Sequence, residues 1–309
     1  MPRLSALAAL GLICGLCAAG PSARASEGGG APGRELLFGI PGTQTQPRGA
    51  TRGEWNYTFL RRNFTQRIFD TGQHEAVRSQ HRKTHVVTWR AEHGLTERVQ
   101  ADAEVVYHAY RQHTHSPGDE HDRNDDGDFE RLYAGFSYQV LEESDAQPAL
   151  RMGGGVLLPS RAETEGIGQE AGLDVMAASG KDIGHWRVGG ALGFSMTFGN
   201  RAHPADPVLS NLALVPISKP HDLKTLRYGV AMTRAINDRW QGNLELIGET
   251  YEYIELNQRR HASTLSLTPG LFVSLPSDRF DGWVGFGVPI GLTEQTSHLG
   301  VAIRTGARF

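Results

Sequence analysis

The sequence predicts an all-β protein, a single transmembrane antiparallel up-and-down β-barrel of about 12 strands. Three observations lead to this prediction. Apolar and polar residues alternate with a period of two in repeated runs, the pattern of strands with one apolar and one polar face. The connections between these runs are alternately short and longer, as they are in outer-membrane barrels. The chain also begins with a segment typical of exported proteins.

The composition excludes two other classes of protein. The chain has 309 residues, with 31 Lys and Arg against 34 Asp and Glu, 38 Gly and 2 Cys. Its formal net charge of −3 excludes a broadly basic protein that coats nucleic acid. After the N-terminal segment there is no second long apolar run, which excludes a helical membrane protein. The glycine content exceeds the usual share of roughly 7%, which together with the alternation favours strands.

Residues 1–25 are predicted to be a cleaved signal peptide. Arg3 supplies the positive start, an apolar stretch follows, and residues 23–25 form an A-x-A cleavage site. Both cysteines, Cys14 and Cys17, lie inside this segment. The mature chain is therefore expected to contain neither a disulfide nor a thiol nucleophile.

The rest of the chain divides into two parts. Residues 26–52, rich in Gly and Pro, are predicted to be a periplasmic N-terminal stub, or a piece that tucks into something else, and residues 53–309 form the barrel. The alternating runs predict strands at about 53–62, 80–92, 96–110, 128–143, 147–159, 169–179, 185–199, 223–235, 239–253, 260–274, 279–289 and 298–309. Such lengths fit the ~9–11 residues with which a tilted strand crosses a bilayer. Because backbone groups in lipid must all be paired, the sheet is expected to close on itself.

Aromatic residues mark the predicted strand ends. Tryptophan is favoured at the level of the lipid headgroups. The tryptophans near predicted periplasmic ends are Trp55, Trp89, Trp186, Trp240 and Trp283. The sequence ends on Phe309, a predicted lipid-facing position of the final run. A terminal Phe that closes such a strand resembles the signal read by the barrel-assembly machinery, so Phe309 is the predicted assembly signal.

Two stretches carry a family resemblance. The first runs through the Asp-Gly-Asp of 126–128, the tyrosine-containing segment 132–138 and the Gly-rich segment 153–159. The second runs through 267–270 and 285–290, just before the terminal strand. These stretches are similar to outer-membrane proteins grouped under the MetA pathway of phenol degradation and described as transporters. The resemblance implies a transporter-type barrel for small aromatic or apolar compounds, and it leaves the cargo open.

One local motif contains the oxygen ligands that Ca²⁺ prefers. Its members alternate around a glycine, as in the first half of a calcium-binding loop. They are Asp122, Asn124, Asp126 and Asp128. The closing Glu of such a loop is missing, because Tyr133 stands at the twelfth position. We therefore predict a solvated acidic loop and no cofactor, with Ca²⁺ binding as the alternative.

Charged residues of both signs fall on the predicted polar faces, which would line the lumen. They are Glu54, Arg90, Arg98, Asp102, Glu104, Arg131, Arg151, Arg187, Arg227, Glu245, Glu249, Arg304 and Arg308. Two interpretations are open for them. They form a screened ion-pair network that fills a narrow barrel, or they line a polar passage.

These observations predict a channel or transporter for small solutes in a Gram-negative outer membrane, and not an enzyme. The expected partners are outer-membrane lipid and lipopolysaccharide, the barrel-assembly machinery and a small-molecule solute, with no nucleic acid. The alternatives are an outer-membrane lipid or ester hydrolase, although no G-x-S-x-G motif is present, and a structural or adhesin-like barrel. An autotransporter translocator would need a passenger domain, and only residues 26–52 precede the predicted barrel.

Overall fold

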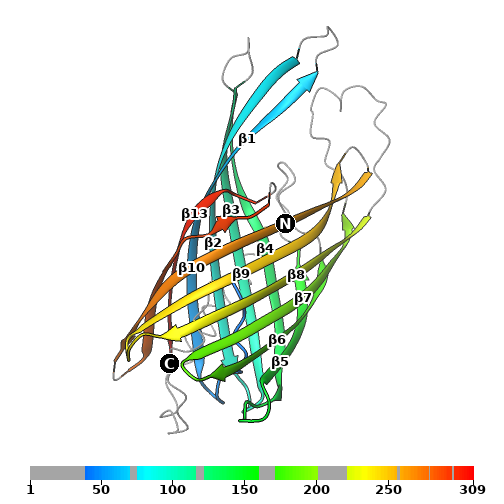
Figure 1. Cartoon of the computed structure of the whole chain (residues 1–309). Helices are drawn as coiled ribbons and strands as arrows, with labels where there is room; N and C mark the ends of the chain where they lie inside the picture. The colour runs from blue at the N-terminus through cyan, green and yellow to red at the C-terminus, as the bar shows by residue number, and fades with distance from the viewer. Residues whose placement is uncertain are drawn as a thin grey trace.

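The computed structural model describes residues 39–69, 75–115, 122–159, 171–200, 221–255, 258–277, 279–293 and 296–309 (Figure 1). Within these residues the regular elements are strands, and no helix is long and apolar enough to cross a membrane. The strands are β1 (Thr51–Phe69), β2 (Glu75–Gly94), β3 (Val99–His115), β4 (Asp122–Leu141), β5 (Ala149–Leu158), β6 (Gly172–Ile183), β7 (Trp186–Asn200), β8 (His221–Ala235), β9 (Trp240–Glu255), β10 (Gln258–Pro276), β11 (Asp281–Gly287), β12 (Ile290–Gly291) and β13 (Leu299–Arg308).

The strands form one closed sheet. Neighbouring strands pair antiparallel, and β1 pairs both with β2 and with β13, which closes the cylinder. β12 has two residues and lies between β10 and β13, as β11 does. Pro289, which has no N–H to donate to the ladder, separates β11 from β12. Counting β11 and β12 as one strand of the wall gives twelve, so the predicted up-and-down barrel of about 12 strands is confirmed.

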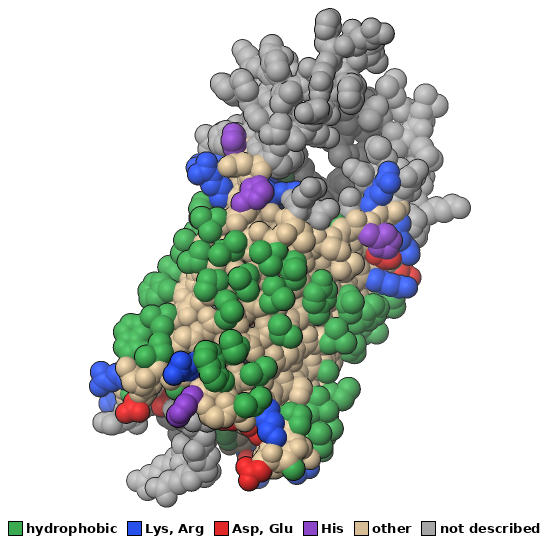
Figure 2. All heavy atoms as spheres, viewed as in Figure 1, with side chains coloured by type: hydrophobic (Ala, Val, Ile, Leu, Met, Phe, Trp, Pro, Cys, Tyr) green, Lys and Arg blue, Asp and Glu red, His purple; other side chains and the backbone are tan. Residues whose placement is uncertain are grey.

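Successive residues of each strand point to opposite sides of the wall. On β7 the side chains of Trp186, Val188, Leu192 and Phe194 are exposed on the outside, whereas Arg187 is buried inside. Figure 2 shows how such side chains cover the outer wall with apolar surface. A closed sheet with an apolar outside and a polar inside is the arrangement of a membrane-spanning barrel.

Trp283 departs from the pattern predicted for the tryptophans. Its side chain is 5% exposed and packs inside the barrel against Phe272 and Ala302. The guanidinium of Arg52 lies over its ring, 4.9 Å from the centroid. The headgroup position expected for Trp283 is therefore wrong, because its place in the alternation of β11 turns the ring inward.

One end of the barrel has short turns and also holds both ends of the barrel sequence. The N–H of Thr51 donates to the carbonyl of Phe309 at 3.1 Å, and the N–H of Phe309 donates back at 2.8 Å. The turn between β6 and β7 is only two residues long, and its Gly184 has a φ of 61°, a left-handed conformation that favours glycine. Short turns face the periplasm in outer-membrane barrels, so we call this the periplasmic end.

The first four strands are longer than a membrane crossing requires. β1 to β4 have 17 to 20 residues, whereas β5 and β6 have 10 and 12. They extend beyond the rest of the wall at the end opposite the short turns (Figure 1). The predicted strands 53–62, 80–92, 96–110 and 128–143 left residues 63–79 and 111–127 as loops, and this is wrong over much of their length. Strand pairing needs only backbone hydrogen bonds, whereas the apolar alternation used for the prediction arises only where a strand faces lipid.

Candidate functional site: the barrel lumen

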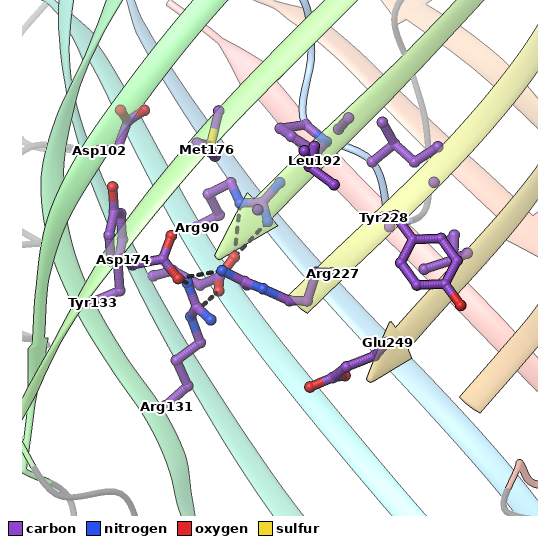
Figure 3. Close-up of a pocket in the computed structure, with 18 of the residues that line it drawn as sticks. Arg90, Asp102, Arg131, Tyr133, Asp174, Met176, Leu192, Arg227, Tyr228 and Glu249 are labelled. Carbon is purple, nitrogen blue, oxygen red and sulfur yellow. Dashed lines mark hydrogen bonds and ion pairs between the residues drawn. The ribbon is translucent and has the colours of Figure 1, made fainter. Parts of the chain in front are cut away.

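The lumen contains a cavity of about 170 Å³ (Figure 3). Its lining joins two kinds of surface. The charged lining residues are Arg90, Glu92, Asp102, Glu104, Arg131, Arg151, Asp174, Arg227 and Glu249. Apolar lining comes from Ile40, Met176, Ala191 and Ile247, among others. The cavity is therefore a mixed site, able to contact polar and apolar parts of one small molecule.

A continuous chain of ion pairs crosses this lining from β2 to β8. The Nε of Arg90 donates to Glu104 Oε2 at 3.0 Å. Glu104 Oε1 lies 3.0 Å from the Nε of Arg131, whose Nη2 donates to Asp174 Oδ2 at 2.8 Å. Arg227 pairs with the same oxygen of Asp174. Two carboxylates thus connect three guanidinium groups, and Figure 3 shows Arg131 and Arg227 converging on Asp174.

Glycines on the intervening strands make room for this network. β5 lies between Arg131 and Asp174, and β7 lies between Asp174 and Arg227. At this level the inward position of β5 is Gly155, which pairs with Asp174, and that of β7 is Gly193, which pairs with Arg227. A Cβ at Gly193 would lie 3.5 Å from Arg227 Nη2, whereas a Cβ at Gly155 would lie 2.8 Å from the ring of Tyr133, beside Arg131. The glycine-rich strands are therefore part of the site.

A second polar cluster fixes the segment 39–46 inside the barrel. The amide of Gln46 donates to Glu92 Oε2 at 3.0 Å, and its backbone N–H donates to Gln100 Oε1 at 2.7 Å. The backbone N–H of Thr45 donates to Gln139 Oε1 at 2.9 Å. These partners lie on β2, β3 and β4, so the segment is attached to three consecutive strands.

Other strands hold the same segment from the opposite side. Glu245, which is 0% exposed, accepts the backbone N–H of Gly39 at 2.9 Å and the amide of Asn243 at 2.7 Å. Ile40 is buried against Ala231 of β8. At the periplasmic end, Arg187 Nη2 donates to Thr43 Oγ1 at 2.7 Å. Residues 39–46 therefore lie within the lumen, and residues 47–50 connect them to β1 at the periplasmic end, where Gly49 and Ala50 bond to Gly94.

The predicted division of the chain needs correction in this part. Residues 26–52 were expected to form a periplasmic stub, or a piece that tucks into something else. Residues 39–46 lie inside the barrel, in agreement with the alternative, and Thr51 and Arg52 already belong to β1. No alternation marks residues 39–46, because their burial depends on side chains of the strands around them. Residues 1–38, including the predicted signal peptide, lie outside the described residues.

The structure places most of the charged lumen candidates on the inward face of the wall. These are Glu54, Arg90, Asp102, Glu104, Arg131, Arg151, Arg187, Arg227, Glu245, Glu249, Arg304 and Arg308. Arg98 is misplaced in the prediction, because the strand begins at Val99 and not at 96. Its side chain is exposed in the turn and pairs with Glu142 at 3.0 Å.

The candidate set missed several residues of the site. Asp174 joins two arginines, and Glu92 lies 3.8 Å from Arg151 Nη1, yet neither was chosen. Both residues occupy inward-facing, polar positions in the alternation of predicted strands, so the sequence pattern could have identified them. Gln100 and Gln139 are uncharged and are also buried in the lumen. Their role in holding the lumen segment can be recognised only once the segment's position is known.

The acidic motif does not form the predicted loop. The backbone from Asp122 to Asp128 is part of β4 and pairs with β3, from Asp122 opposite Thr114 to Asp128 opposite His108. A calcium-binding loop must wrap around the ion, whereas this backbone is extended. Among the described residues, no three His, Cys, Asp or Glu side chains are grouped as metal ligands. Whether Ca²⁺ binds was a prediction and stays one.

The last residue, Phe309, lies on the lipid side of the wall at the periplasmic end. It is exposed, and its ring centroid is 6.0 Å from that of Phe280. This position agrees with the parity assigned to it. Its role as an assembly signal remains a prediction.

Comparison with known proteins shows the fold. No family model matches the chain, and no curated protein matches it. Its structure is similar to that of an outer membrane channel from Pseudomonas putida F1, with a TM-score of 0.57, 12% identity, and coverage of 87% of this chain and 99% of that one. It is also similar to the transport unit of the autotransporter AIDA-I from Escherichia coli, with a TM-score of 0.50, 7% identity, and coverage of 89% and 94%. The chain thus has the fold of outer-membrane barrels, while the likeness to the MetA-pathway group remains a prediction.

Proposed function

We propose that this chain is a channel of the Gram-negative outer membrane that passes small solutes through its lumen. The observation that carries the proposal is the cavity lined by the ion-pair chain, inside a wall whose outside is apolar. Rings of charged side chains commonly determine which ions or solutes a pore lets through. The likeness in fold to the Pseudomonas putida channel supports this function over that of a lipid or ester hydrolase.

The lumen segment 39–46 limits the passage. It crosses the periplasmic half of the barrel and is held mainly by hydrogen bonds from polar side chains, among them Gln100 and Gln139. Each such hydrogen bond contributes only about 0.5–1.5 kcal/mol net, because water can replace the protein partner. A solute must therefore pass beside this segment or displace it, and we expect a small conductance in its presence.

The cavity also favours a class of solute. Its volume of about 170 Å³ is similar to the ~150 Å³ that holds benzene in an engineered protein cavity. Ile40, Met176 and Ile247 offer apolar contacts beside the charged groups. Both features support compounds with one aromatic ring or a short apolar body, the class that the MetA-pathway resemblance implies.

Planar-bilayer recording tests the channel directly. We expect the purified mature chain to give a small conductance, and a variant that lacks residues 26–46 to give a several-fold larger one. If neither protein conducts, the channel proposal fails. Turnover of lipid or ester substrates by the same preparation would then favour the hydrolase, and absence of both activities would favour a structural or adhesin-like barrel.

A further inference from the structure

The outer wall formed by β1, β2 and β3 changes from apolar to basic within two residues. Strand register aligns the outward side chains in rows. One row consists of Trp55, Trp89 and Val105, the next of Tyr57, Val87 and Tyr107, the next of Phe59, His85 and Ala109, and the next of Arg61, Lys83 and Arg111. The three basic side chains of the last row are exposed. We call Arg61, Lys83 and Arg111 the basic row.

The basic row lies at the outer boundary of the membrane-spanning wall. Arg61 is ten residues beyond Thr51, the first residue of β1, and a tilted strand crosses the bilayer in ~9–11 residues. Leu299, which pairs with Arg61, is still exposed on the outside and apolar. Long basic side chains at such a boundary extend their charge toward the headgroups while their stems contact apolar surface. The row therefore faces the outer leaflet at headgroup level.

Elsewhere on this boundary the described charges are mixed. On β8 to β10 the outward residues Lys224 and His261 lie on either side of Glu252. Glu252 also lies 3.7 Å from the guanidinium of Arg259. A carboxylate thus lies among the basic groups on that side. In the basic row, Asp125 of β4 stands opposite Arg111 in the strand register. The register partners of Arg61 and Lys83 are Leu299, each other and Arg111, so these two residues have no acidic partner across the strands. Figure 2 shows basic side chains and histidines at the upper margin of the apolar wall.

We propose that the basic row binds the phosphate groups of lipopolysaccharide in the outer leaflet. Guanidinium and ammonium groups form strong charge-assisted hydrogen bonds with phosphate. The apolar row below, with Phe59 and Val301, lies where the acyl chains of the same lipid would pack. The proposal depends on the proposed function only for the location of the barrel in the outer membrane.

Binding of diphosphoryl lipid A to the purified full chain in detergent micelles tests this proposal. The double variant Arg61→Gln/Lys83→Gln should weaken binding about tenfold or more, because each basic group near a membrane surface adds appreciably to the attraction of anionic lipid. The matched control Lys224→Gln/Arg259→Gln removes one Lys and one Arg from the mixed side, and its affinity should stay within about twofold of the parent. The charge-conserving variant Arg61→Lys/Lys83→Arg should retain most of the binding.

Two results would overturn the proposal. One is equal loss of affinity in the two charge-removing variants, provided that both show the heat-modifiable migration of a folded barrel. The other is equal binding of the parent to diphosphoryl lipid A and to lipid A from which the phosphates have been removed. Conductance recorded on the same proteins keeps the two proposals apart, because the basic row lies outside the lumen and its variants should conduct like the parent.

Discussion

The two sides of the barrel wall are built differently at the level of the cavity. On β2 to β4 the inward positions carry long charged side chains, among them Arg90, Glu104 and Arg131. On β5 and β7 the corresponding positions are Gly155 and Gly193. β2 to β4 supply most of the charges of this network, whereas β5 and β7 place glycines beside the one carboxylate that β6 supplies, Asp174. A lumen described only by its charged residues would miss half of what shapes it.

We call β5 to β7 the glycine-rich half of the wall. The largest loss of stability should come from a charge placed on its lipid-facing side. Leu192 is 55% exposed near the middle of β7, and Leu192→Arg should lower the free energy of unfolding by about 2–4 kcal/mol. Leu299 is 54% exposed but pairs with Arg61 and so lies level with the basic row, and Leu299→Arg should cost only about 0–1 kcal/mol. Denaturant unfolding in lipid vesicles measures both. Equal costs would show that the two positions lie at the same membrane depth.

Removal of the carboxylate that the glycine-rich half contributes should have the next largest effect. Asp174→Ala leaves Arg131 and Arg227 facing each other without the shared oxygen. Breaking a buried ion pair costs about 3–5 kcal/mol, and partial exposure of Arg227 reduces this to about 2–3 kcal/mol. The same unfolding measurement checks it, with Asp174→Glu as the charge-conserving control. A loss below 0.5 kcal/mol, roughly, would mean that water replaces the carboxylate.

Filling the space should have a smaller effect that depends on the strand. A Cβ at Gly155 would lie 2.6 Å from Gly135 Cα and 2.8 Å from a ring carbon of Tyr133. Gly155→Ala should therefore destabilise the barrel by about 1–2 kcal/mol. At Gly193 the nearest atom, Nη2 of Arg227, is 3.5 Å away, an ordinary contact. Gly193→Ala should leave stability unchanged, and if it destabilises as much as Gly155→Ala, the space on β7 is tighter than the structure indicates.

The smallest effect is expected outside the lumen. Arg98 and Glu142 form an ion pair between two exposed side chains in the periplasmic turns. Exposed pairs of this kind contribute little, so Arg98→Ala should change neither the denaturation midpoint nor the conductance. A changed conductance would place Arg98 at the pore mouth after all.

The lipid-facing wall was predictable because lipid imposes a period of two on the sequence. Leu192 and Arg187 could be assigned to opposite faces without any knowledge of their neighbours. The partners within the lumen were not predictable in this way. That Arg131 reaches Asp174 depends on the register of three strands and on a glycine between them. Residues 39–46 have no periodic pattern, so the sequence left two alternatives for them, and the strands that hold them could be identified only from the structure.

The pairing of β1 with β13 has a consequence for how the protein folds. Arg52 and Arg308 are neighbours across this seam although almost the whole barrel sequence separates them. Contacts so distant in sequence form slowly, because a long loop must close before any stabilising interaction is gained. Until β13 arrives, β1 presents an unpaired strand edge, which is prone to associate with other chains. The nascent barrel therefore needs protection from aggregation for a long time, until β13 pairs with β1.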